Sequence, residues 1–331
     1  LNGVSGPTVI RITADQTAPT GGYVLGSSIL NPTLNTTNTL TFVGSNFSTT
    51  DMYRTLFAQS GSGNNDAIFT VQGSNYVTFR KVNLEEVATN TTNTSLMERG
   101  YSIVKFNKDT GTKKTSIVDC YIKLNNANTT AASGIAPYGA TGIFIGNCTY
   151  LSNTALALAV SEDGTNDGAY ISACKIQNVN NGIYHAGIAT IGDGTSYNDK
   201  NLIIVGDTIE NFTHYGISIS YSNSDLVSGN ILNNLSSGGT APTTNHIMGI
   251  RYANNYPVTL QTNNSWDCFY NKINLTINSA NTYSATGIYT QIYGNGNTTI
   301  EGDTIQLTST GNSAMLSGIY SQNQLGTQRI A

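Results

Sequence analysis

A short motif recurs between residues 142 and 319 of this chain. It is a glycine followed by an isoleucine, inside a stretch where apolar and polar residues alternate. Its glycines are Gly142, Gly182, Gly216, Gly249, Gly287 and Gly318, at spacings of 40, 34, 33, 38 and 31 residues. A period of roughly 20–50 residues is the signature of a repeat architecture, in which one unit buries its apolar face only by stacking on its neighbours. The 331 residues are therefore expected to fold as stacked units.

A second motif comes before these glycines. It has an apolar residue, two spacers, then Asn, Asp or Cys, one spacer and isoleucine. Clear copies span 117–122, 171–176, 204–209 and 300–305, and looser copies span 226–232 and 270–273. Apolar residues alternate with polar ones over only a few positions in each motif, which is typical of short strands.

Parallel β-helix is the repeat fold that these motifs favour. No helical stripe of apolar residues persists between the motifs, which excludes helical repeats. A propeller would show four strands per repeat and recurrent tryptophans, whereas the chain has one, Trp266. We predict a single all-β domain over 1–331, with N-terminal coils and long loops over 1–100 and regular coils over 101–331. On the order of 10 coils would form a rod of roughly 50 Å.

Specific positions have a predicted role in such a helix. Inward Ile, Val and Leu should stack into ladders, and Asn or Asp at the inward turn should hydrogen-bond to the coils above and below. Cys120 and Cys174 share that turn position, where we expect buried thiols rather than a functional pair. Glycine before each isoleucine should relieve crowding where the chain bends.

Composition narrows the possible partners and location. Only 10% of residues are charged and the net charge is −4, so no nucleic-acid partner is expected. No apolar run is long enough to span a membrane, and the four cysteines have no zinc-site spacing. Few lysines and many Asn and Thr suggest an extracellular protein. The chain starts at Leu1 without a signal peptide, and we expect it to be part of a longer chain.

The rhythm of Asn or Asp, then isoleucine, then Gly-Ile-Tyr resembles the right-handed parallel β-helix repeats of the pectin-lyase-like superfamily, clearly over 117–320. The opening residues 1–10, LNGVSGPTVI, are similar to the first coil of large secreted surface proteins of Bacteroidota. Proteins of that class are often exported by the type IX system and act as adhesins. The resemblance implies an extracellular or cell-surface location and a further region beyond Ala331.

One outward position is the main candidate for ligand binding. The residues two positions after the motif glycines are Phe144, Tyr184, Ser218, Arg251, Tyr289 and Tyr320. If each isoleucine points inward, these side chains point outward. A strip of outward aromatic rings could stack against sugars. The alternative is cross-strand stacking that only stiffens the sheet.

Enzymes of the superfamily are polysaccharide lyases and hydrolases, so catalysis is an alternative. The polygalacturonase-like signature does not appear in the sequence. Glycoside hydrolysis needs two carboxylates on either side of one bond, and Glu162 and Asp163 would have to meet Asp193 or Asp199 across adjacent coils. Asp163 and Asp167 could also bind Ca²⁺, although a solvated turn is favoured and no other cofactor is expected.

The three histidines, His185, His214 and His246, fall at different offsets from their glycines. We therefore expect exposed or locally bonded imidazoles rather than a metal or catalytic cluster. The resulting prediction is an extracellular adhesive or structural β-helix segment that contacts glycans or other surface proteins. The two alternatives are a polysaccharide-active enzyme and a self-associating filament subunit.

Overall fold

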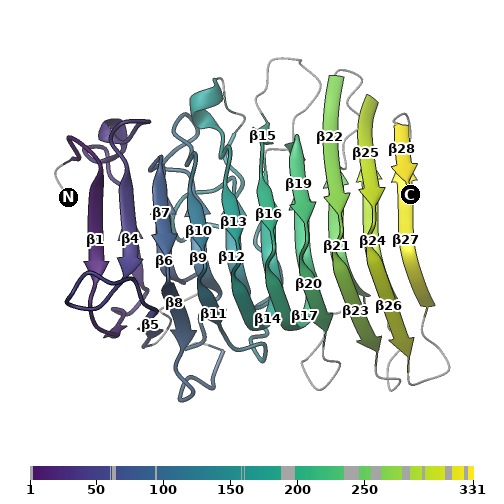
Figure 1. Ribbon diagram of the computed structural model, residues 1–331, viewed down its shortest axis with the longest axis horizontal. Coiled ribbons are helices and arrows are strands. Elements are labelled where there is room, and N and C mark those ends of the chain that lie inside the picture. The colour runs from purple at the N-terminus through teal and green to yellow at the C-terminus, as the bar shows by residue number, and fades with distance from the viewer. Residues whose placement is uncertain are drawn as a thin grey trace.

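The computed structural model is a rod of stacked coils with the N-terminus at one end and the C-terminus at the other (Figure 1). It describes residues 3–59, 61, 65–93, 95–157, 159, 161–187, 198–234, 246–254, 262–277, 284–292, 295–309, 315–323 and 327–331. Ten strands stack side by side in one sheet, and successive coils pair in parallel. The predicted parallel β-helix of about ten coils is confirmed.

Each coil has three faces. The first face is the ten-stranded sheet, and the second and third faces are the two arms of a 16-stranded sheet. The first face contains β1 (Thr8–Ile12), β4 (Leu40–Gly44), β7 (Val77–Arg80), β10 (Ser116–Val118), β13 (Tyr170–Ser172), β16 (Ile203–Val205), β19 (Asp225–Ser228), β22 (Thr262–Phe269), β25 (Asn295–Glu301) and β28 (Thr327–Ile330).

Two long strands, β14 (Lys175–Ala186) and β17 (Thr208–Ser220), run through both arms of the larger sheet. The second face also contains β2 (Gln16–Thr17), β5 (Arg54–Ala58), β8 (Val82–Glu86), β11 (Tyr121–Lys123), β20 (Ile231–Asn234), β23 (Lys272–Ile277) and β26 (Thr304–Ser309). The third face also contains β3 (Tyr23–Leu25), β6 (Ala67–Gln72), β9 (Arg99–Val104), β12 (Thr141–Gly146), β21 (His246–Asn254), β24 (Ser284–Ile292) and β27 (Met315–Asn323).

The remaining elements are short: β15 (Asp199–Lys200) pairs with β18 (Ser222–Asn223), and η1 (Asn31–Thr33) and η2 (Glu162–Gly164) are single 3-10 turns. None of the helical segments in the described residues is long and apolar enough to cross a membrane.

Apolar side chains from the three faces meet inside the rod. Ile117, Ile171 and Ile204 are in register on the first face and fully buried. The second and third faces each add a similar column, for example Ile122 with Ile176 and Ile143 with Ile183. Since strands of consecutive coils are about 4.8 Å apart, like residues pack directly on one another. The predicted ladders are confirmed.

The motif glycines form a column on the third face where two backbones approach closely. A Cβ atom added to Gly182 would lie 2.4 Å from the carbonyl oxygen of Gly216 and 2.6 Å from a methyl group of Ile209. At Gly249 it would meet the oxygen of Gly287 and a methyl group of Ile273. Because these distances are far below van der Waals contact, a larger residue would push neighbouring coils apart.

The corner between the first and second faces is a sharp bend made by one residue in the left-handed region. Asp119, Ala173 and Gly206 have φ values of 52°, 54° and 69°. The residue after the bend points into the rod, and these residues stack in a column that we call the corner ladder. Its members are Val82, Cys120, Cys174, Asp207, Asn230, Asn271 and Asp303.

Amide and carboxyl groups of the corner ladder bond from one coil to the next. Asp207 accepts a 2.7 Å hydrogen bond from the amide of Cys174, and Asn230 accepts one of 2.9 Å from the amide of Asp207. Asn271 accepts from the amide of Asn230 at 3.0 Å, and Asp303 accepts from that of Asn271 at 2.6 Å. The predicted inward Asn and Asp ladder is confirmed.

Burial raises the pKa of two ladder members, Asp207 and Asp303, and Asp207 is the more deeply buried of the two. Burial raises its pKa from the usual 3.8 to about 7. Asn230 and Asn271 donate from Nδ2 to the preceding coil at Ile204 and Val227, whereas Oδ2 of Asp207 has no partner among the described residues. An amide or a protonated carboxyl suits this place better than a carboxylate.

We expect Asp207→Asn to stabilise the protein above neutral pH. Between about pH 4 and pH 7 the folded state binds more protons at Asp207 than the unfolded state does, so this residue's contribution to stability falls as the pH rises. The variant should be about 1–3 kcal/mol more stable than the parent at pH 8 and similar at pH 4, measured by urea unfolding. Asp109→Asn at an exposed aspartate serves as the control; an unchanged pH dependence in D207N would contradict the prediction.

Candidate functional site

The outward position two residues after each glycine forms one continuous column on the third face. Phe144, Tyr184, Ser218, Arg251, Tyr289 and Tyr320 are direct register partners from coil to coil. We call this set the outer column. The alignment predicted from the repeat is therefore present, and the exposure of the side chains differs along it.

Aromatic rings and a guanidinium group occupy the later coils of the outer column. Tyr289 and Tyr320 stack with centroids 5.5 Å apart and planes 8° apart. Tyr184 lies 6.1 Å from Tyr215, which is outward on β17, and the guanidinium of Arg251 lies 5.6 Å from the centre of the Tyr215 ring. Tyr184, Arg251 and Tyr289 are half-buried and Tyr320 is exposed. This part of the face can offer flat rings and N–H donors to a ligand.

Phe144 differs from the later rings, because it lies at the outward position and is nevertheless covered. Its side chain is fully buried in a small apolar cluster with Val104, Cys148 and the loop residue Ile135. The guanidinium of Arg99 lies 3.8 Å from the centre of its ring. Loop residues thus cover the outer column in this coil, and the ring is not presented to a ligand.

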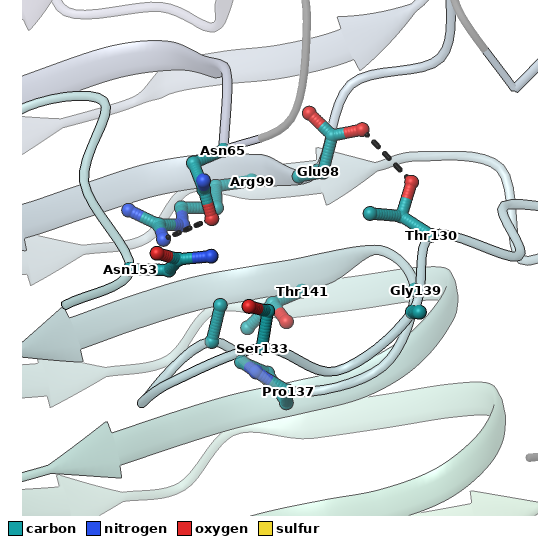
Figure 2. Close-up of a pocket in the computed structure, with 11 residues that line it drawn as sticks. Asn65, Glu98, Arg99, Thr130, Ser133, Pro137, Gly139, Thr141 and Asn153 are labelled. Carbon is teal, nitrogen blue, oxygen red and sulfur yellow. Dashed lines mark hydrogen bonds between the residues drawn. The ribbon is translucent and has the colours of Figure 1, made fainter.

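A polar cavity of about 80 Å³ lies beside this covered part of the third face. Glu98 and Arg99 at the start of β9 and Thr141 of β12 line one side, and residues of the loops 124–140 and 147–169 line the other. Figure 2 shows Arg99 next to Asn65 and Asn153, with Ser133 and Pro137 on the facing loop. A cavity of this size holds a few waters or one polar group of a ligand.

Glu98 is the acidic group of the cavity. It accepts a hydrogen bond from the hydroxyl of Thr130 at 3.1 Å (Figure 2). It also accepts one from the amide of Asp66 at 3.0 Å. Burial raises its pKa, and the nearby Asp66 carboxylate adds to the shift. Behind it, burial raises the pKa of Glu86 to about 7. A carboxyl group in this setting keeps its proton at higher pH and can act as an acid.

Arg99 is buried, and neutral side chains accept hydrogen bonds from its guanidinium group. Its guanidinium donates to Asn65 at 3.0 Å and to Ser102 at 3.3 Å. Burial lowers its pKa, and the opposite charges of Glu98 and Asp66 act against that shift. The pair Glu98–Arg99 was not among the predicted site residues. The sequence signal that could have indicated this pair is two adjacent charged residues in a chain in which only 10% of residues are charged.

The acidic residues predicted as a catalytic set do not converge in a groove in the described part of the chain. Glu162 is exposed and pairs with Lys200 at 2.7 Å, and Asp163 is exposed and pairs with Lys113 at 2.9 Å. Asp199 is fully buried and lies 3.1 Å from His185. Asp193 lies outside the described residues.

Asp167, the second residue predicted for a calcium site, is buried. It accepts a hydrogen bond from the amide of Lys200 at 3.0 Å. Burial raises its pKa to about 6, and the nearby Asp199 carboxylate adds to this shift. Within the described residues no three His, Cys, Asp or Glu side chains are grouped to hold a metal ion. Calcium at Asp163 and Asp167 stays a prediction.

Each histidine has its own local surroundings. His185 is buried between Asp199 and the carbonyl oxygen of Ser220. His214 stacks on Tyr215 with ring centres 3.7 Å apart, and burial lowers its pKa to about 3. His246 hydrogen-bonds with the hydroxyls of Thr286 and Ser284.

Comparisons with known proteins support the fold. No model of a known protein family matches the chain, and no curated protein sequence does. The native structure of a GH136 lacto-N-biosidase from Eubacterium ramulus has a TM-score of 0.50 at 10% identity, covering 97% of this chain and 63% of that one. ORF18 of Geobacillus virus E2 has a TM-score of 0.47 at 12% identity, covering 100% and 56%. Endopolygalacturonase I from Stereum purpureum has 0.42 at 14% identity, covering 99% and 92%.

These structural neighbours include β-helix proteins of the pectin-lyase-like type. The chain spans 63% of the length of the lacto-N-biosidase structure. At such low identity the likeness establishes the parallel β-helix fold alone.

Replacing an outer-column ring should have different effects on stability in different coils. Phe144→Ala removes a fully buried ring and should lower the free energy of unfolding by about 3–5 kcal/mol. Tyr320→Ala, at a residue 48% exposed, should change it by about 1 kcal/mol or less. Urea unfolding of the two variants checks this. Equal losses would mean that the loops do not cover Phe144 as described.

Proposed function

We propose that this chain is a glycan-binding segment of an extracellular protein and that its outer column is the binding surface. The observation that carries the proposal is the register of Tyr184, Arg251, Tyr289 and Tyr320 on one face. Flat rings suit the apolar faces of sugar rings, and the guanidinium can donate to hydroxyl groups. A role in adhesion, through glycans or through other surface proteins, follows from this proposal.

The order of the side chains in these coils supports binding. Arg251 is held by the hydroxyls of Ser218 and Ser220 at 3.1 and 2.9 Å, and Tyr289 is stacked on Tyr320. Side chains that are already ordered lose little entropy when a ligand binds. The resemblance of residues 1–10 to Bacteroidota surface proteins supports a cell-surface location and export by the type IX system as a further part of the proposal.

We expect the double variant Tyr289→Ala/Tyr320→Ala to lose most of its glycan affinity. Two lost stacking contacts correspond to a decrease on the order of tenfold in affinity. Candidate ligands come from a glycan array, and titration calorimetry with the best ligand gives the affinity. Tyr170→Ala is the matched control, because Tyr170 is an exposed strand tyrosine on the first face. Equal binding by all three proteins would refute the role of the outer column.

Glycan cleavage is a second candidate, favoured by the cavity. Glu98 has the raised pKa of a general acid and faces a polar cavity next to Arg99. Two further carboxyl groups lie nearby: Asp66 raises the pKa of Glu98, and Glu98 in turn raises the pKa of Glu86. Some of the similar solved structures are named as a lacto-N-biosidase, an endopolygalacturonase and an alginate lyase.

If the cavity is catalytic, Glu98→Gln should lower the rate of polysaccharide shortening by about 100-fold or more, measured by size-exclusion chromatography of neutral and acidic polysaccharides with and without Ca²⁺. The parent's rate should fall as the pH rises through the raised pKa of Glu98, because the acid loses its proton. Glu85→Gln, at a partly exposed glutamate paired with Lys123, is the control. Polysaccharides left intact by the parent protein would contradict the cleavage role.

A third proposal is that the partner is a second copy of this chain. Sedimentation equilibrium over a range of concentrations tests it, because it gives the molar mass of the protein in solution.

A further inference from the structure

The corner ladder contains two cysteines on consecutive coils. Cys120 follows the left-handed residue Asp119, and Cys174 follows the left-handed residue Ala173. The flanking strands are in register, with Val118 opposite Ser172 and Tyr121 opposite Lys175. Cys120 and Cys174 therefore occupy the same position one coil apart, and both side chains are buried.

The thiol of Cys174 reaches back toward the coil that contains Cys120. Its Sγ donates to the carbonyl oxygen of Ile117 at 3.4 Å, three residues before Cys120. The amide of Lys175 donates to the carbonyl oxygen of Cys120 at 2.9 Å, which holds the two backbones together. Burial raises the pKa of the Cys174 thiol, and the neighbouring Cys120 thiol adds to the shift.

The backbone separation suits a covalent link. Residues stacked on consecutive coils are about 4.8 Å apart, inside the range of roughly 4.4–6.8 Å between the Cα atoms of disulfide-bonded cysteines. Later members of the ladder connect the coils by hydrogen bonds between Asp207, Asn230 and Asn271. Between the coils of Cys120 and Cys174 the two ladder residues carry thiols in place of amide or carboxyl groups.

We propose that Cys120 and Cys174 form a disulfide bond between consecutive coils when the protein folds in an oxidising environment. The oxidant is a small-molecule disulfide such as oxidised glutathione. The thiolate of one cysteine attacks it to give a mixed disulfide and one released glutathione thiol; the second cysteine then displaces the other glutathione and forms the Cys120–Cys174 bond. The cysteines together lose two protons and two electrons, and one oxidised glutathione becomes two reduced molecules.

The other two cysteines are natural controls. Cys148 lies in the small cluster with Phe144, and Cys268 is on the first face between Val227 and Ile300. All four thiols are free and buried in the described structure. Because an oxidant cannot reach a buried thiol, the bond should form during folding and not after incubation of the folded, reduced protein.

The test is refolding of the reduced, unfolded full chain in a mixture of oxidised and reduced glutathione. Remaining thiols are alkylated in denaturant and counted by mass spectrometry, and linked peptides are identified after digestion. We expect two alkylated cysteines, Cys148 and Cys268, and one peptide pair joined through Cys120 and Cys174. The midpoint of thermal unfolding should be higher in the oxidised than in the reduced protein, on the order of 5 °C.

Two variants make the result decisive. The double variant Cys148→Ser/Cys268→Ser should still form the bond, and Cys174→Ser should keep its three remaining thiols free. If Cys174→Ser fails to fold, the linked peptide in the double variant decides alone. Four alkylated cysteines in the folded parent, or a link through Cys148 or Cys268, would overturn the proposal. Glycan binding is measured separately and has no influence on this outcome.

Discussion

The fold depends on exact stacking at the corner between the first and second faces. One left-handed residue turns the chain there, and the next residue points into the rod, where water cannot satisfy its polar atoms. Burial makes the hydrogen bonds between coils obligatory for Asp207, Asn230 and Asn271. A coil that slipped by one residue would lose these bonds and would turn its isoleucines outward. The corner ladder therefore sets the register of all three faces.

Register at the corner also determines the chemistry of the outer surface. Because each coil presents the same positions in the same order, the outer column becomes a line along the rod. The loops then divide that line into two regions. In the early coils they cover Phe144 and enclose the polar cavity with Glu98 and Arg99. In the later coils Arg251, Tyr289 and Tyr320 are accessible to different degrees. One face thus combines a small enclosed polar site with an open aromatic surface.

Most of the fold could be predicted from the sequence repeat, whereas little of the cavity could. Gly-Ile spacing and the Asn, Asp or Cys position predicted the strands, the corner ladder and the alignment of the outer column. The burial of Phe144 could not be predicted, since it depends on how the loop with Ile135 folds over the third face. Glu98 and Arg99 were missed because their coil has Gly-Tyr in place of Gly-Ile. Asp199 and Glu162 come from neighbouring coils, as expected, but one side chain points inward and the other into solvent.

The corners also differ in how much added chain they can accept. From β7 onward, the connection from the first to the second face is only one or two residues long, for example 119–120 between β10 and β11. The connection from β11 to β12 spans 124–140, and that from β12 to β13 spans 147–169. In these coils inserted segments can therefore be accommodated along two edges of the rod and not along the third. New binding loops can arise, or be grafted by design, on the side of the cavity without disturbing the edge that holds the coils in register.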